Sequence, residues 1–136
     1  MSFSHLHIKN ALGLYGETFA AHLLEEKGYT ILERNCKIGP LEIDIIAENK
    51  EVVAFVEVRT RAYMFQGQTP EQSVNKDKQW HLSRAANAYV KMHRITKRVT
   101  LDVIGLIIDP RTKEVTYINH IQDAFNAPLQ IGRAHV

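Results

Sequence analysis

The sequence predicts one domain of the α/β class, because helical and strand patterns alternate along a chain with enough apolar residues for a core. It has 136 residues, 45% of them hydrophobic and 24% charged, which is ordinary for a globular domain. Apolar residues recur at helical spacing over 11–27 and 69–93, whereas runs rich in Ile, Val and Phe mark strands. We expect residues 1–10 to be a flexible arm, 11–126 the domain and 127–136 a C-terminal tail.

The first helix is expected from about Ala11 to Lys27, before a glycine stop at Gly28. Its inward side holds apolar residues at helical spacing, namely Leu12, Tyr15, Phe19, Ala20, Leu23 and Leu24. Glycines at 13 and 16 weaken the helix, but they allow its backbone to approach the sheet or a ligand closely. Glu17 lies at the rim of the apolar side, either as an ordinary flanking residue or as a carboxylate that reaches over the sheet edge.

Two central strands are expected next, after a strand at 29–32 and irregular chain around 34–35 and 39–40. Residues 41–46 and 52–59 are separated by a polar turn, which predicts an antiparallel hairpin. Alternation along the first strand puts Leu41, Ile43 and Ile45 on one face and its two carboxylates on the other. The second strand is apolar on both faces up to residue 56, which is typical of a central strand.

Carboxylates within these strands are the main candidates for chemistry. Glu42 and Asp44 share one face of the first strand, and Glu57 and Arg59 share one face of the second. Each has an ordinary interpretation, because the first pair could line a solvated face and the second could be a simple ion pair. Taken together, acidic positions on adjacent strands suggest a site for a hard divalent cation, with the Val58 carbonyl as a further oxygen ligand.

The second half of the chain supplies a loop, a helix and a second hairpin. Residues 61–68 are expected to form an exposed loop whose Tyr63 and Phe65 either contact a substrate or pack back onto the domain. Thr69, Pro70 and Gln72 predict a helix start. Its inward side is expected to contain Val74, Leu82, Ala85, Ala86, Tyr89 and Met92.

Lys78 falls in the middle of that inward side, so it either extends past the helix end or reaches the acidic cluster. Trp80 lies outside it, as a surface aromatic or as a packing partner for another element. Strands at 99–108 and 115–118 predict the second hairpin, and residues 121–126 predict a helical turn. Asp102 is expected to be a buried structural partner of a Lys or Arg.

Several classes of protein are disfavoured by composition and motifs. A single cysteine, Cys36, allows no intramolecular disulfide, and no apolar run has the length of a signal peptide or membrane span, so we expect a cytoplasmic protein without membrane contact. No zinc-ligand spacing, P-loop, GxGxxG or GxSxG motif occurs. The net charge is only +2. Basic residues nevertheless cluster at 91–98, as a solvated helix end or a nucleic-acid contact, and around the candidate site at Arg59, Arg61, Lys76, Lys78 and Arg84.

Several segments together resemble the YraN family of predicted endonucleases. They are Gly16-Glu17 with Ala20-Ala21, residues 28–35, Glu42-Ile43-Asp44-Ile45-Ile46-Ala47, Phe55-Val56-Glu57-Val58-Arg59-Thr60-Arg61, Lys78-Gln79, Asp102-Val103 and Asp123-Ala124-Phe125-Asn126. That family is similar to archaeal-type Holliday-junction resolvases and belongs with the restriction-endonuclease-like nucleases. The resemblance therefore implies a restriction-endonuclease-like α/β fold, a central mixed β-sheet flanked by α-helices, and metal-dependent hydrolysis of phosphodiester bonds in DNA.

The catalytic pattern of the nuclease superfamily, an aspartate on one strand and Glu-x-Lys on the next, corresponds to Asp44, Glu57 and Arg59. Glu17 corresponds to the acidic residue of the first helix. The sequence departs from the pattern at Leu41, where glycine is expected, at Ile43, where proline is frequent, and at Arg59, where lysine is usual. An arginine stabilises a phosphate but cannot act as a general base.

The resemblance leads to one main hypothesis and two alternatives. In the main one, Asp44 and Glu57 bind Mg²⁺ or Mn²⁺, and Glu42 either supports them or is a ligand of a second ion. Lys78 replaces the missing lysine or grips the scissile phosphate. The DNA, including branched or recombination intermediates, is then contacted by Arg59, Arg61, Lys78 and Gln79. Symmetric cutting of a junction would require a homodimer. The first alternative is a catalytically weak or inactive DNA-binding accessory protein, and the second is a protein-interaction domain with structural carboxylates.

Overall fold

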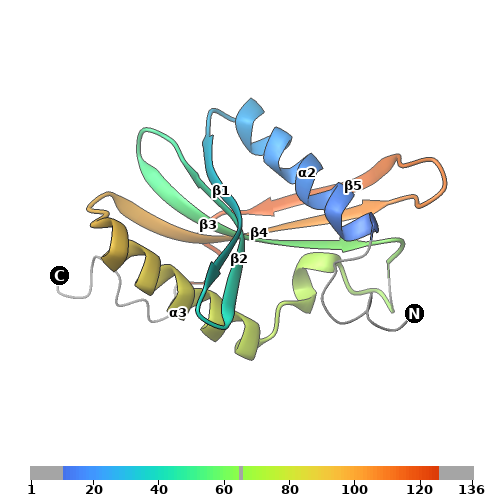
Figure 1. The fold of residues 1–136 in the computed structure, drawn as a ribbon. Helices are drawn as coiled ribbons and strands as arrows, with labels where there is room; N and C mark the ends of the chain where they lie inside the picture. Colours follow the sequence, from blue (N-terminus) through green and yellow to red (C-terminus); the bar gives the residue numbers. More distant parts are fainter. Residues whose placement is uncertain (1–10, 65, 126–136) are drawn as a thin grey trace.

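The computed structural model describes residues 11–64 and 66–125 and shows a five-stranded sheet between two helices (Figure 1). In chain order the elements are α2 (Ala11–Glu26), β1 (Thr30–Ile38), β2 (Leu41–Glu48), β3 (Val52–Arg61), the 3₁₀ helix η1 (Pro70–Ser73), α3 (Lys76–His93), β4 (Arg98–Ile108) and β5 (Val115–Ile121). The expected arm and tail, Phe65 and Asn126 lie outside the described residues. Within the described ranges, no helix has the length and apolarity needed to cross a membrane.

The strands follow the order β1-β2-β3-β4-β5, and the sheet is mixed. β2 pairs with β1 and with β3 in antiparallel fashion, and β5 pairs antiparallel with β4, so both predicted hairpins are confirmed. β3 and β4 are parallel from Val52 and Arg98 to Arg61 and Ile107, because η1 and α3 form the crossover between them. The predicted α/β class is confirmed, and the arrangement is consistent with a restriction-endonuclease-like fold.

Each face of the sheet packs against one helix (Figure 1). On the α2 side, Ala20 and Leu24 belong to an apolar layer that includes Val56 from β3. On the α3 side, Leu82 and Ala86 belong to a second layer around Phe55. Because β3 is buried on both faces, the prediction of a central strand at 52–56 is confirmed.

Strand β1 is longer than the sequence predicted. Residues 34 and 35, expected to be irregular, lie within the strand, where Arg34 pairs with Ile45 of β2. Asn35 adopts a left-handed backbone (φ 52°), a conformation that asparagine tolerates better than most residues. The polar residues 34 and 35 therefore mark a local backbone irregularity within the edge strand β1, and they do not mark the end of that strand.

The predicted helix over 69–93 is interrupted near its start. The Thr69 N–H donates to Gln72 Oε1 at 2.8 Å, but this first turn is the separate helix η1. Val74 is extended, and Asn75 then caps α3 by accepting a hydrogen bond from the Lys78 N–H at 2.9 Å. The prediction failed because Asn75 offers a second cap close to the first.

Three further predictions require correction. Met92 is 65% exposed in the last turn of α3, and Val90 packs against the sheet instead. Buried Asp102 pairs with His120 (Oδ2 to Nε2, 2.8 Å), not with a Lys or Arg. The Asp123 N–H also donates to Asp102 at 2.9 Å, which holds the chain after Ile121 against this carboxylate. Residues 122–123 therefore form a non-helical turn, and the helical turn predicted at 121–126 is wrong.

Gly16 brings α2 close to β3. A β-carbon at this position would lie 2.1 Å from Thr60 Oγ1 and 3.1 Å from Thr60 Cβ. The absence of a side chain therefore sets the distance between helix and strand, and with it the position of the neighbouring Glu17. The close backbone approach predicted from the helix glycines is found at Gly16.

We predict that Gly16→Ala lowers the free energy of unfolding by about 1–3 kcal/mol, because it overpacks the contact between α2 and β3. Urea unfolding of the variant and the wild type measures this change. Thr60→Ala removes the nearest colliding atom, so the Gly16→Ala/Thr60→Ala double variant should lose less stability than the sum of the two single variants. Strict additivity would contradict this account.

Glu71, in η1, anchors the crossover to the last hairpin. Its Oε2 accepts hydrogen bonds from Tyr117 Oη at 2.5 Å and from Asn119 Nδ2 at 2.7 Å. Burial alone would raise the pKa of Glu71, but the donors Asn119 and Tyr117 outweigh burial and lower it. The ionised form is therefore the one that holds η1 on the sheet.

A carboxylate with a lowered pKa stabilises the fold above its unfolded-state pKa, near 4.3, and this contribution is lost as the pH falls further. We expect Glu71→Gln to lower the free energy of unfolding by about 1–3 kcal/mol at pH 7 and to weaken its dependence on pH below about 4.5. Denaturant titrations between pH 3 and 7 measure both effects. If the free energy of unfolding of Glu71→Gln depended on pH as strongly as that of the wild type, a group other than Glu71 would be responsible for the acid dependence.

Candidate functional site

The site forms where β2 separates from β3. Their pairing ends at Ile45 and Val56, although β2 continues back to Leu41 along β1 and β3 continues forward along β4. Asp44 is the first residue beyond the last pair, and its Oδ2 accepts a hydrogen bond from the Val58 N–H at 2.9 Å. A side-chain carboxylate thus takes the place of a strand-to-strand hydrogen bond.

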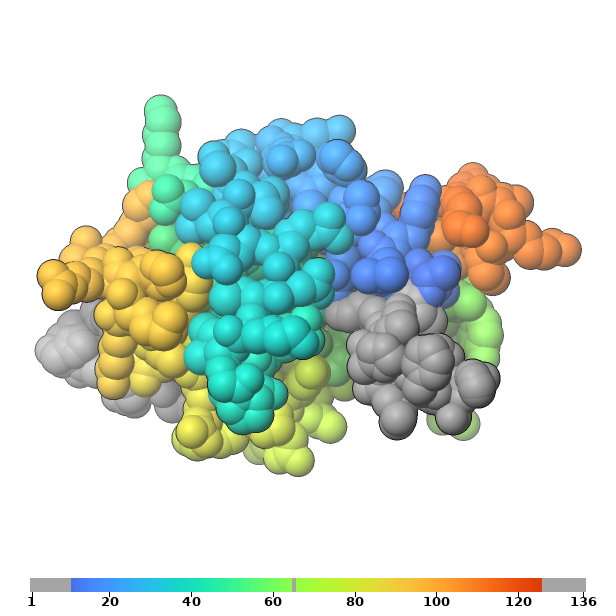
Figure 2. Space-filling view, viewed as in Figure 1, coloured from blue at the N-terminus to red at the C-terminus, as the bar shows by residue number. Residues whose placement is uncertain are grey.

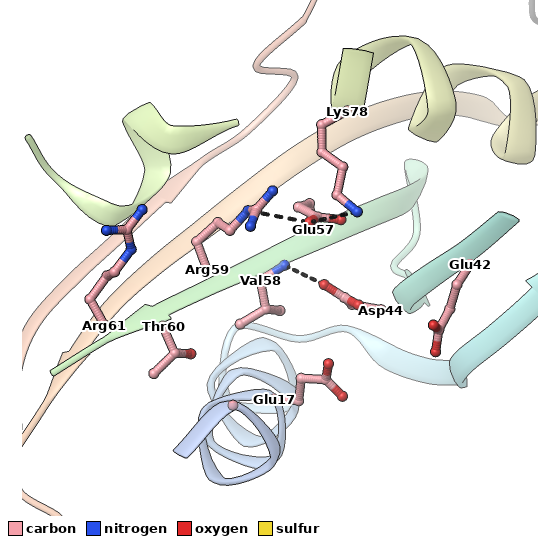
Figure 3. A pocket seen from close by; sticks show the side chains of 10 residues that line it. Glu17, Glu42, Asp44, Glu57, Val58, Arg59, Thr60, Arg61 and Lys78 are labelled. Atoms are coloured by element: carbon pink, nitrogen blue, oxygen red, sulfur yellow. Dashed lines mark hydrogen bonds and ion pairs between the residues drawn. The ribbon is translucent and has the colours of Figure 1, made fainter. Parts of the chain in front are cut away.

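The separation also changes the faces of β2. Ile43 packs in the layer on the α3 side, whereas Ile45 packs in the layer on the α2 side. The prediction that Leu41, Ile43 and Ile45 share one face is therefore wrong, since alternation breaks at Asp44. The break directs the Asp44 carboxylate towards the Val58 N–H and into the gap between the strands (Figure 3).

A cavity of about 280 Å³ occupies this gap (Figure 3). It collects side chains from α2, β2, β3 and α3, and most of the predicted site residues are among them. Its described lining is Gly13, Glu17, Glu42, Asp44, Glu57, Val58, Arg59, Thr60, Arg61 and Lys78. Four of these residues carry carboxylates and three are basic, so the cavity is strongly polar.

Glu57 lies on the α3 side of the cavity and is only 6% exposed. Its Oε2 is 3.4 Å from Arg59 Nε and 3.8 Å from Lys78 Nζ. Lys78 thus extends from the start of α3 to a carboxylate on the neighbouring strand, as Figure 3 shows. Arg59 follows Glu57 along the same face of β3.

Glu17, which is 1% exposed, enters the cavity from the α2 side. Its Oε1 lies 4.0 Å from Arg34 Nη2. In the amide orientation that satisfies its neighbours, Asn35 donates to Glu17 Oε1 at 3.1 Å and to Glu42 Oε2 at 3.2 Å. The carboxylates thus form two groups, one around Glu57 and its cations and one around Asn35, with Asp44 hydrogen-bonded to the strand on which Glu57 lies.

Arg34 and Asn35 are site residues that the sequence did not predict, because their polarity is also typical of irregular chain. One available signal was Glu17 at the rim of the apolar side of the first helix, since a carboxylate near the core needs a donor nearby. Gln79 is not among the residues that line the cavity. Its Nε2 donates to the Val74 carbonyl at 3.1 Å, and its side chain lines a separate cavity beside Glu71.

The donor set determines which ion this cavity suits. Within residues 11–64 and 66–125, no three His, Cys, Asp or Glu side chains are grouped as ligands of one metal ion. Mg²⁺ commonly uses one or two carboxylates and keeps several waters. Asp44 and Glu57, which both line the cavity, supply hard oxygen donors of that kind. The residues therefore fit Mg²⁺ or Mn²⁺ better than zinc, for which nitrogen and sulfur ligands are usual.

The fold and the cavity define an α/β protein with a mixed sheet and a buried carboxylate cluster at a strand separation. Comparison with known families adds that residues 16–106 match the uncharacterised protein family UPF0102. The chain is 39% identical to a UPF0102 protein of Bacteroides thetaiotaomicron over 88% of this chain and 96% of the relative. It is 42% identical to the UPF0102 protein CT2262 of Chlorobaculum tepidum over 84% and 91%, respectively. The chain therefore belongs to the UPF0102 family, which is the YraN family.

The bridge formed by Asn35 yields a prediction. Asn35→Asp replaces the shared donor by a third carboxylate between Glu17 and Glu42, so we expect the free energy of unfolding at pH 7 to fall by about 1–3 kcal/mol. The loss should shrink at about pH 4.5, where carboxyl groups begin to take up protons.

Chemical denaturation at both pH values provides the measurement. Asn75→Asp is the matched control, because aspartate and asparagine are equally good at a helix N-cap. Equal stability of Asn35→Asp and this control at pH 7 would show that the amide does not bridge the two carboxylates.

Proposed function

We propose that the protein is a metal-dependent nuclease that hydrolyses phosphodiester bonds in DNA, including branched or recombination intermediates. The observation that carries the proposal is the convergence of Asp44 and Glu57 on one cavity, with Arg59 and Lys78 beside Glu57. The family resemblance to junction resolvases supports the same chemistry. A protein with this function acts in the cytoplasm, and symmetric junction cutting requires two copies of the chain.

Asp44 and Glu57 are the residues that would hold a Mg²⁺ or Mn²⁺ ion. Bound there, the ion would polarise the phosphate and lower the pKa of a water molecule for attack at phosphorus. The Val58 N–H fixes one oxygen of the Asp44 carboxylate, so the other oxygen has a restricted direction before any ligand arrives. Val58 thus orients Asp44 through its backbone.

Arg59 and Lys78 supply positive charge on the Glu57 side of the cavity. A guanidinium stays protonated, so Arg59 stabilises negative charge on phosphoryl oxygens and does not remove a proton from water. Lys78 is 44% exposed along its side chain and lies on a different element from Glu57. It can therefore leave Glu57 for a phosphate at lower cost than a fully buried lysine could.

A second candidate function is a DNA-binding accessory protein that keeps the fold without the chemistry. The observation that favours it is the charge balance around Glu57, where the cations of Arg59 and Lys78 lie within 4.0 Å of its carboxylate and offset its charge. The arginine at position 59, where lysine is usual, also favours this accessory function. Such a protein binds DNA with an affinity that survives loss of Asp44 and Glu57.

We expect cleavage of labelled DNA by the wild type in Mg²⁺ or Mn²⁺ but not in chelator, and a loss of at least about 100-fold in Asp44→Asn and Glu57→Gln, as expected when essential carboxylate ligands are removed. Single-stranded, duplex and four-way-junction substrates are compared by gel electrophoresis. Glu51→Gln is the matched control, because Glu51 is an exposed carboxylate at the turn between β2 and β3.

Circular dichroism of each variant separates lost chemistry from lost folding. Metal-dependent cleavage by a folded Glu57→Gln protein at the wild-type rate would exclude the proposed site. If none of the proteins cuts DNA while wild type and Asp44→Asn retard the junction equally in a gel, the accessory function replaces the nuclease.

A further inference from the structure

The outer face of α3 carries an aromatic side chain between basic ones. Positions 76, 80, 84, 87 and 91 recur at spacings of three or four residues, so they share one face of the helix. That face holds Lys76, Trp80, Arg84, Asn87 and Lys91. It lies opposite the buried side of the helix, where Leu82, Ala85 and Tyr89 pack on the sheet.

None of these basic side chains is compensated within the part of the chain that the structure describes. Lys76, Arg84 and Lys91 are exposed, and no described acidic residue forms an ion pair with any of them. Elsewhere on the surface, Lys97 pairs with Glu48 and Arg98 pairs with Asp123. The outer face of α3 therefore keeps positive charge available for an external anion.

Trp80 is 56% exposed in the middle of this charge. Trp80 belongs to neither of the two apolar layers that pack on the sheet. Its indole face is open to a flat partner, and flanking cations would hold an anionic chain alongside it. In the space-filling view, α3 lies at the surface beside β1 and β2 (Figure 2).

We infer that the outer face of α3 binds single-stranded nucleic acid, with Trp80 stacking on an unpaired base and Lys76, Arg84 and Lys91 contacting phosphates. The inference deepens the proposed function, on which it rests, by naming the class of substrate. The two sites share α3, because Lys78 reaches the cavity at Glu57 from the inward side of the helix and Trp80 lies on its outer face. A single strand that passes around the start of α3 would contact both.

The chemistry of the face excludes two other partners. A membrane surface requires several apolar residues along one helix face, and Trp80 is the single one in this set. Duplex DNA offers phosphates, but its bases are stacked on one another and unavailable to an exposed indole. From residue 76 to 91 the helix spans roughly 22 Å, which corresponds to about six nucleotides at the 3.4 Å spacing of a B-form strand.

Trp80 is the only tryptophan in the sequence, so its fluorescence reports on this face alone. We titrate the full chain in chelator, where cleavage is blocked, with a 12-nucleotide single strand, the same sequence as a duplex, and inorganic polyphosphate. Quenching by the single strand, with little change on adding duplex or polyphosphate, is expected. Equal responses to the single strand and to polyphosphate would mean that charge alone binds there, and would overturn the inference.

Anisotropy of a labelled single strand then measures affinity in the variants. We expect Trp80→Ala to weaken binding about tenfold, as loss of one stacked base predicts, and Trp80→Phe to retain most of the affinity. Lys76→Ala and Arg84→Ala should each reduce the slope of log affinity against log salt by about 0.7. Arg111→Ala, which removes an exposed cation from the turn between β4 and β5, should leave both quantities unchanged.

The outcomes separate this inference from the proposed function. Quenching and stacking without any metal-dependent cleavage would contradict the nuclease and leave the α3 face as a binding surface. Cleavage that depends on Asp44, together with wild-type affinity in Trp80→Ala, would support the nuclease and overturn the inference about α3.

Discussion

The hydrogen bond from the Val58 N–H to the Asp44 carboxylate is the interaction on which the site depends. It occurs where β2 stops pairing with β3, so it satisfies a backbone donor that would otherwise lie buried without a strand partner. The same bond allows the sheet to open. Without the opening, the carboxylates of β2 and β3 would lie among apolar layers, where the cost of burying a charge is high.

Each buried carboxylate near this opening has its own compensation. Arg59 and Lys78 lie beside Glu57, whereas Asn35 and Arg34 serve Glu17 from the opposite side. Removal of one partner from such a group is costly, because the remaining charge stays in a poorly solvated place. The protein therefore maintains a high density of charge inside a small domain by distributing donors among β3, α3 and the edge strand β1.

The sequence predicted the parts of the fold that local patterns determine. Apolar runs located β2, β3 and β4, and charged positions within them located Asp44 and Glu57. Predictions failed where a distant partner decides the local structure. β1 continues through Asn35 because β2 pairs with it, and Asp102 is paired by His120 from another strand. The separation of β2 from β3 has no local signal, so the break in alternation between Ile43 and Ile45 was not predictable.

The parallel pairing of β3 with β4 has a consequence for how the chain folds. β2 and β3 form a hairpin whose paired residues are close in sequence, so it closes quickly. Val52 pairs with Arg98, and this pairing must close a loop that contains η1 and α3. Contacts between residues far apart in sequence form slowly, because the entropy of the enclosed chain must be lost first. The two carboxylates are therefore brought together by an early, local step, and the lysine that compensates one of them arrives with a late, long-range step.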